Sequence, residues 1–185
     1  YDLETYPNCF TMAVVYASGK GKRHFEISNR KDDTEALLDF LRKVKVNGHR
    51  MIGFNNIGFD YPVLHHILKK SADCRVNGSP LKVTPTELYR VAMTIIEKMK
   101  TSKFGANIRS SDVLIPQVDL FKVHHFDNKA RMTSLKMLEF NMRSTSIEDL
   151  PFPVGMVLDS AQMDTLLVYN HKDVEETLKF YYHSL

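Results

Sequence analysis

The first 28 residues contain short runs of apolar, β-branched and aromatic residues typical of β-strands. Residues 10–16 are rich in β-branched and aromatic side chains, and residues 24–28 repeat this pattern after a Gly-Lys-Gly-Lys turn at 19–22. A short acidic segment, residues 1–5, precedes them. The pattern therefore predicts a three-stranded meander that contains a hairpin and begins with an acidic strand.

The remainder of the chain changes to helical spacing, interrupted by short apolar runs. Apolar residues at intervals of three and four, together with capping residues such as Thr84 and Asp159, predict helices. We expect helices over residues 34–46, 60–70, 85–100, 134–142 and 160–182, and further strands over 51–54 and 117–121. This order predicts a single α/β domain over residues 1–185, with a mixed central β-sheet flanked by helices. The acidic strand would lie centrally, and the last helix would pack across it.

Composition excludes several classes of protein. A hydrophobic fraction of 43% in 185 residues is enough for one buried core, and no apolar run approaches the roughly 18 residues of a membrane span. Cys9 and Cys74 show no metal-binding spacing, which argues against a zinc finger or a disulfide framework and fits a cytoplasmic location. The formal net charge of +3 permits a nucleic-acid partner. Because the acidic strand follows Tyr1 directly, we expect the chain to be part of a longer polypeptide.

Four acidic residues and one tyrosine carry the candidate chemistry. Asp2 and Glu4 are two apart and would point to the same face of a strand, whereas Tyr169 and Asp173 are four apart and would share one face of a helix. Asp60 ends a short polar segment before another helix. Such carboxylates can hold a pair of divalent cations roughly 3.5–4 Å apart, an arrangement suited to cleaving phosphodiesters.

The order of these motifs resembles the 3′→5′ proofreading exonuclease domains of family B and related phage DNA polymerases. These belong to the ribonuclease H-like DEDD exonuclease superfamily, in the branch with a tyrosine four residues before the last aspartate. The resemblance covers essentially the whole chain and implies a ribonuclease H-like fold. The matching positions are Asp2, Glu4 and Thr5 in the first motif, Asn56, Phe59 and Asp60 in the second, and Tyr169 and Asp173 in the third.

The resemblance also implies a role for each acid. Asp2, Glu4 and Asp173 would bind the metal ion that activates water, with Asp2 bridging both ions, and Asp60 would hold the second ion. Hard carboxylate oxygens suit Mg²⁺ or Mn²⁺. Tyr169 would orient the attacking hydroxide.

The implied substrate is the 3′ end of single-stranded DNA, and the implied partner is a polymerase domain in the same full-length polypeptide. One departure from protein-primed phage polymerases is that no lysine occurs between Met137 and His171, where they carry one that supports catalysis. We therefore expect another subgroup. The residues expected to contact the terminal nucleotides are Leu3, Thr5, Asn56, Phe59, Ser134 and Leu135.

Structural alternatives exist for each motif. An edge strand can carry two solvated acids, Asp60 can cap a helix, and Tyr169 can be an amphipathic core residue. Ser134 can likewise cap a helix, and Asn56 can belong to a turn. For Asp119, in a predicted strand, a structural hydrogen bond is favoured over a place at the acidic site.

Two other functions stay open at the level of sequence. One is a free-standing exonuclease of the same superfamily that acts on RNA or short oligonucleotides. The other is a nucleic-acid-binding module that retains the fold without turnover. The presence of every required acid argues against the second.

Overall fold

A computed structural model describes residues 1–102, 105–124 and 150–185 of the chain as a mixed α/β structure. The predicted helix 134–142 falls outside these described residues. The remaining predicted elements are present, but the helix predicted over residues 60–70 extends to Asn77, and the end of the predicted strand 117–121 belongs to a helix. The elements are β1 (Asp2–Tyr6), β2 (Cys9–Val15), β3 (Lys22–Ser28), α1 (Thr34–Val46), β4 (Met51–Gly53), α2 (Asp60–Asn77), α3 (Pro85–Thr101), the 3₁₀ turn η1 (Ser110–Asp112), β5 (Gln117–Asp119), α4 (Leu120–Val123) and α6 (Ser160–His183).

The strands form two sheets in the described part of the chain, where the pattern predicted one. β1, β2 and β3 pair antiparallel in that order, and β4 pairs parallel with β5. The two sheets meet where the amino group of Tyr1 donates a hydrogen bond to the carbonyl of Ile52 (2.8 Å). Among the described strands β1 pairs with β2 alone, so it is the edge strand of its own sheet, and the predicted central position of the acidic strand is wrong.

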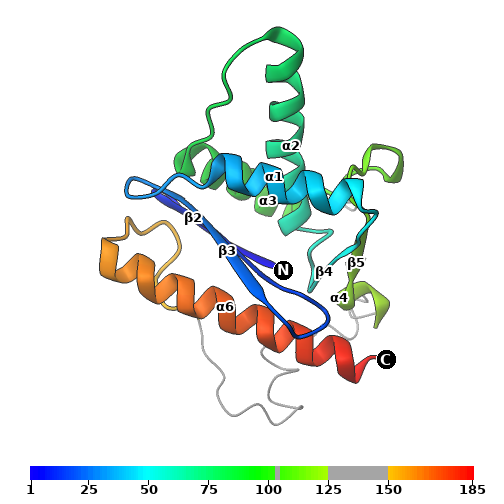
Figure 1. The fold of residues 1–185 in the computed structure, drawn as a ribbon. Coiled ribbons are helices and arrows are strands. Elements are labelled where there is room, and N and C mark those ends of the chain that lie inside the picture. The colour runs from blue at the N-terminus through cyan, green and yellow to red at the C-terminus, as the bar shows by residue number, and fades with distance from the viewer. Residues whose placement is uncertain (103–104, 125–149) are drawn as a thin grey trace.

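Helices cover both faces of the three-stranded sheet (Figure 1). α6 lies across one face against β1 and β2, as the sequence predicted, and α1 and α3 cover the other face. The apolar side chains between α1, α2, α3 and the sheet form the main core, which includes fully buried Phe10, Met12, Leu37 and Leu64. A smaller cluster around Tyr6 and Leu166 lies beneath α6. None of the described helices is long and apolar enough to cross a lipid bilayer.

The start of α6 matches its sequence signal in full, the start of α3 matches it in part, and α2 ends later than predicted. Asp159 and Gln162 form a complete capping box at the start of α6. Thr84 accepts the N–H of Glu87 at the start of α3, but the Glu87 side chain pairs with Lys70 (2.6 Å), so the reciprocal half of that box is absent. α2 continues past the predicted end and stops at Gly78, which adopts a left-handed conformation.

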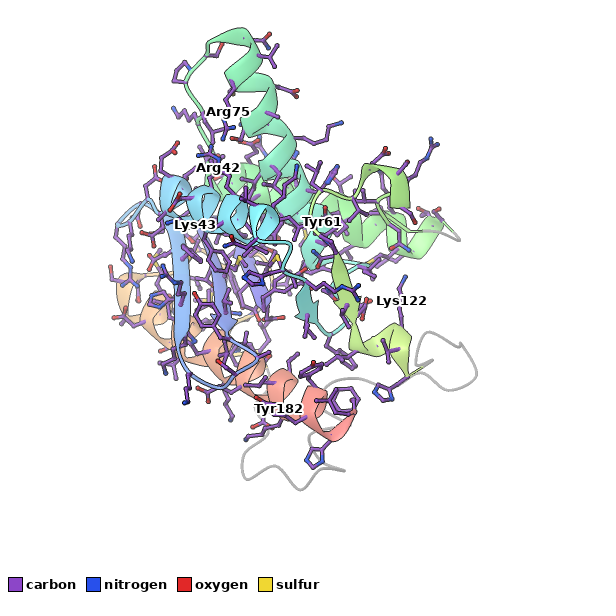
Figure 2. The ribbon with its side chains drawn as sticks, turned by 45° about the vertical axis from the view of Figure 1, so that its right-hand side comes forward. Arg42, Lys43, Tyr61, Arg75, Lys122 and Tyr182 are labelled. Atoms are coloured by element: carbon purple, nitrogen blue, oxygen red, sulfur yellow. The ribbon has the colours of Figure 1, made fainter. Side chains whose placement is uncertain are left out.

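A buried tyrosine joins α2 to the segment that precedes β5. The Tyr61 hydroxyl accepts the backbone N–H groups of Leu114 (2.7 Å) and Ile115 (3.2 Å), and its ring lies between these elements (Figure 2). This contact fixes the approach to β5, and β5 in turn holds the loop that leads to Asp60.

Candidate metal centre

Three acids from opposite ends of the chain converge beside β1. Oxygen atoms of Asp2, Glu4 and Asp173 all lie within 4.8 Å of one another. Asp2 and Glu4 share one face of β1 because strand side chains alternate, and α6 crosses that face and brings Asp173 to them. Among the described residues this is the one acidic or His/Cys group compact enough to hold a metal ion.

A buried asparagine orients Asp2. The Asn170 amide donates to Asp2 Oδ2 (2.8 Å), and its oxygen accepts the hydroxyl of Thr11 on β2 (3.1 Å). Asn170 and Thr11 are both fully buried, so this chain of hydrogen bonds fixes one Asp2 oxygen. Sequence reasoning missed Asn170; its position three residues before Asp173 places it on the same helix face, but its contact with Asp2 follows from the packing of α6 on β1.

Burial raises the pKa of two acids at this site, Asp2 and Asp60. The pKa of Asp2 lies well above its usual range because the carboxyl is buried and because Asp60, Glu4 and Asp173 add negative charge nearby. Burial raises the pKa of Asp60 to about 7, even though the backbone N–H of Leu3 donates to its Oδ1 (3.0 Å). A divalent cation between these oxygens would favour their charged forms and relieve the repulsion.

Asp60 stands apart from the three clustered acids. It is the first residue of α2, is 4% exposed, and falls outside the group whose oxygens lie within 4.8 Å of one another. It nevertheless lines the same cavity as Asp2 and Glu4. Because the N–H of Leu3 is on the unpaired edge of β1, the Asp60 carboxylate also satisfies a backbone donor there.

Tyr169 lies on α6 one turn before Asp173 and is 6% exposed. Burial raises the pKa of its phenol far above the usual range, and Asp173, Glu4 and Asp2 add to the effect. A hydrogen bond to Asp173 also favours the protonated form. Tyr169 is therefore a neutral hydrogen-bond donor and cannot act as a base at neutral pH.

Asp119 holds the loop between β4 and Asp60. Its carboxylate accepts the backbone N–H groups of Asn55 (2.8 Å), Ile57 (3.1 Å) and Phe121 (3.0 Å). Asn55 has a positive φ of 57°, a conformation that asparagine tolerates better than most residues. Asp119 thus has the structural role that its strand position favoured, and it does not join the acidic cluster.

Only some of the residues predicted to contact substrate line the cavity beside the acids. Phe59 and Leu3 line the cavity beside the acids, although Leu3 is only 3% exposed. Thr5 lies further along β1 and is outside that lining. The expected substrate contact of Asn56 does not fit this structure, because Asn56 is fully buried and its side-chain amide hydrogen bonds with that of Gln117 (2.9 Å). Ser134 and Leu135 fall outside the described residues.

A cavity of about 510 Å³, which we call the carboxylate cavity, opens beside the acids. α3 supplies one of its walls, and the sequence had given no role to that region. The residues that line it are Asp2, Leu3, Glu4, Phe54, Asn55, Phe59, Asp60, Ile96, Met99 and Lys100.

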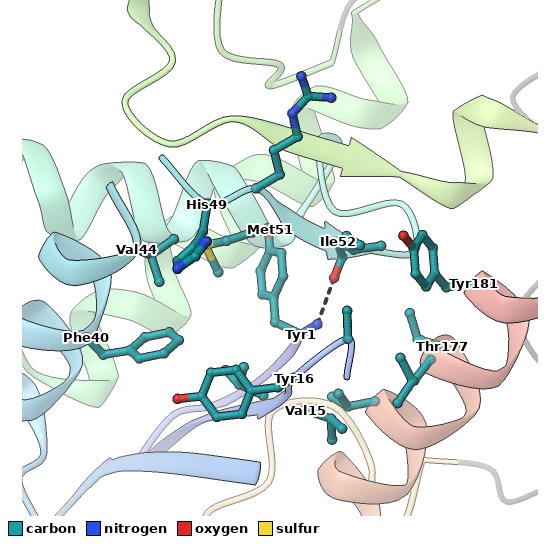
Figure 3. Close-up of a pocket in the computed structure, with 15 residues that line it drawn as sticks. Tyr1, Val15, Tyr16, Phe40, Val44, His49, Met51, Ile52, Thr177 and Tyr181 are labelled. Carbon is teal, nitrogen blue, oxygen red and sulfur yellow. Dashed lines mark hydrogen bonds between the residues drawn. The ribbon is translucent and has the colours of Figure 1, made fainter. Parts of the chain in front are cut away.

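A second cavity, of about 250 Å³, lies between α1, the start of β4 and the last turns of α6 (Figure 3). We call it the apolar cavity. Its walls include Phe40, Val44, Val174 and Leu178, and no aspartate or glutamate is among its lining residues. It therefore offers no carboxylate that could hold a hard cation.

Comparisons with known proteins identify no relative. No family model, no curated protein and no solved structure matches the chain. The functional interpretation therefore rests on the motifs and on the geometry of the site.

Proposed function

We propose that this protein is a metal-dependent 3′→5′ exonuclease of ribonuclease H-like fold. Its substrate would be the 3′ end of single-stranded DNA, and its task would be proofreading for a DNA polymerase. The observation that carries the proposal is the convergence of Asp2 and Glu4 with Asp173, since residues about 170 positions apart bring their oxygens within 4.8 Å. Two of the three motifs that support the resemblance thus meet in space, and the remaining motif supplies Asp60 to the cavity that Asp2 and Glu4 line.

The residues at this site fit hard divalent cations. Carboxylate oxygens are the donors that Mg²⁺ and Mn²⁺ prefer, and the raised pKa values of Asp2 and Asp60 reflect burial and repulsion that a cation would offset. In the proposed mechanism Asp2, Glu4, Asp173 and Asp60 hold the cations. When bound, these ions would lower the pKa of water and neutralise charge on the scissile phosphate.

The protein's own groups then position the reaction. Asn170 holds Asp2 in a fixed orientation through a 2.8 Å hydrogen bond. The protonated phenol of Tyr169 orients the attacking water for in-line displacement of the 3′-terminal nucleotide, a positioning effect and not proton abstraction. Phe59 offers an aromatic face at the cavity, where a base can stack whatever its sequence.

The test is digestion of a 5′-labelled single-stranded DNA in Mg²⁺, in Mn²⁺ and in EDTA. We expect a ladder of products that shorten one nucleotide at a time from the 3′ end in either metal and no products in EDTA. Asp2→Asn should be inactive, whereas Asp39→Asn, which changes an exposed acid on α1, should match the wild type. Digestion of an RNA strand of the same sequence under the same conditions shows whether the enzyme prefers DNA or RNA.

Two results would contradict the proposal. One is digestion that persists in EDTA or in Asp2→Asn. The other is a first product cut from the interior of the strand, because an exonuclease must begin at the terminus.

A further inference from the structure

α3 carries none of the catalytic acids, yet three of its residues line the carboxylate cavity. Ile96, Met99 and Lys100 are spaced by three and four residues, so they lie on one face of the last two turns of α3. They line the carboxylate cavity together with Asp2 and Glu4. One face of a helix thus presents two apolar side chains and one cation to a site whose other charges are negative.

The apolar part of this wall is exposed. Met99 is 42% exposed, and Ile96 and Phe59 are half-buried. Together they make up an apolar part of the lining of the carboxylate cavity. Such a surface suits the face of a nucleobase, which stacks on apolar and aromatic groups without regard to sequence.

The cation has an electrostatic reason to be there. Of the ten residues that line the carboxylate cavity in the described part of the chain, Lys100 alone is positively charged. In the proposed mechanism the acids would hold divalent ions that offset their own charge and that of the scissile phosphate. The next phosphate along the strand brings a further negative charge, and the ammonium group of Lys100 is available to balance it.

We propose that the end of α3 forms a binding subsite for the nucleotide on the 5′ side of the scissile bond. Lys100 contacts its phosphate, and Ile96, Met99 and Phe59 pack against its base. This inference rests on the proposed exonuclease function and adds a second point of attachment for the strand. It also gives a role to α3, which carries none of the three motifs.

A simpler explanation for Lys100 is that a basic residue at the end of a helix offsets the helix dipole. Lys98 provides the matched control, because it lies in the same last turn, is exposed and has the same charge, but does not line the cavity. If Lys100 only offset the helix dipole, replacement of Lys100 or of Lys98 would change DNA binding equally. If Lys100 belongs to the subsite, its replacement weakens DNA binding and that of Lys98 does not.

The first experiment measures binding of a fluorescent single-stranded DNA by anisotropy, with Ca²⁺ in place of Mg²⁺ so that the strand is not cleaved. We expect Lys100→Ala to weaken binding about five- to tenfold and to reduce the slope of log affinity against log salt by about 0.7, the value for one phosphate contact in a single strand. Lys98→Ala should bind like the wild type, and Lys100→Arg should restore most of the affinity. Equal binding by Lys100→Ala and Lys98→Ala would overturn the subsite.

The second experiment measures hydrolysis of an oligonucleotide and of a dinucleoside monophosphate, which has one phosphodiester and lacks the neighbouring phosphate. The wild type should prefer the oligonucleotide in kcat/KM, and this preference should shrink about five- to tenfold in Lys100→Ala, mainly through KM, and persist in Lys98→Ala. An unchanged preference in Lys100→Ala would overturn the subsite while the exonuclease activity stands. Absence of metal-dependent hydrolysis in the wild type would overturn the proposed function. The difference in DNA binding between Lys100→Ala and Lys98→Ala would then decide whether the end of α3 binds the strand.

Discussion

The acidic cluster and the apolar cavity use adjacent residues of one helix in opposite ways. On α6, Asp173 joins the acids beside β1, whereas its neighbour Val174 lines the apolar cavity. Successive residues of a helix point about 100° apart, so one helix can serve two environments. The carboxylate cavity gathers like charges that repel one another. The apolar cavity is lined by side chains whose burial stabilises the fold.

This difference shows that the two regions contribute to stability with opposite sign. Burial and neighbouring negative charge raise the pKa of Asp2 and Asp60, so their ionised forms oppose folding when no cation is bound. The packing of Phe40 against Phe25, with ring centroids 5.3 Å apart, favours folding under all these conditions. Substitutions in the two regions should therefore separate activity from stability.

The largest expected effect comes from Asp173→Asn. It removes one charge from the acidic cluster while keeping the side-chain volume and an oxygen that can accept the hydrogen bond of Tyr169. We expect kcat/KM on single-stranded DNA to fall by about 10³-fold or more, because a lost metal contact removes several kcal/mol of transition-state stabilisation. In EDTA the melting temperature should rise, since one repulsive charge is gone.

The control for that variant is Glu175→Gln, which neutralises an exposed acid two residues further along α6. It should leave both quantities close to those of the wild type. A melting temperature that falls in Asp173→Asn would contradict the view that the acids oppose folding in the absence of metal.

The next effect is a dependence of stability on pH in the metal-free protein. The pKa of Asp60 is about 7 in the folded state and 3.8 for the free side chain. Between these values the folded protein holds a proton that the unfolded chain has lost, so the free energy of unfolding must fall as pH rises through this window. Each pKa unit corresponds to about 1.4 kcal/mol, and we expect a decrease of roughly 3 kcal/mol from pH 4 to pH 8.

Chemical denaturation in EDTA across this pH range measures the effect. Asp60→Asn should make the pH dependence shallower, because an asparagine side chain does not titrate, while Asp2, whose pKa is also raised, keeps a contribution of the same sign. Mg²⁺ should stabilise the wild type more at pH 8 than at pH 5. If the dependence in Asp60→Asn were as steep as in the wild type, another group would be responsible.

The smallest effect is expected at the apolar cavity. Phe40→Leu removes part of a side chain that is 9% exposed and packs against Phe25. We expect it to lower the free energy of unfolding by about 1–2 kcal/mol, as is usual for a moderate loss of core packing. The variant should keep its kcat/KM, because α1 contributes nothing to the carboxylate cavity. Val46→Ala, at an 84% exposed position on the same helix, controls for changes in helix propensity.

A marked loss of activity in Phe40→Leu at a temperature where it is folded would contradict the expected separation of activity from stability. The apolar cavity and the acidic cluster would then be coupled through α6, which carries both Asp173 and the cavity residue Val174. Unchanged activity together with reduced stability would sharpen the separation between them.

The sequence by itself determined the local structure and named the acids. Strand alternation, helical spacing and capping residues such as Asp159 are properties of neighbouring residues, so β2, β3, α1 and α6 were predicted close to their observed limits. The same local spacing predicted that Asp2 and Glu4 share a face, as do Tyr169 and Asp173. It could not show how the two pairs meet.

Only the tertiary structure decided which side chains surround those acids. Asn170 contacts Asp2 because α6 crosses β1 at one position, and Asp119 holds the loop before Asp60 because β5 pairs with β4. The same packing buried Asn56 and brought Lys100 to the cavity wall. These contacts depend on the packing of elements far apart in the chain, and no pattern among neighbouring residues encodes that packing.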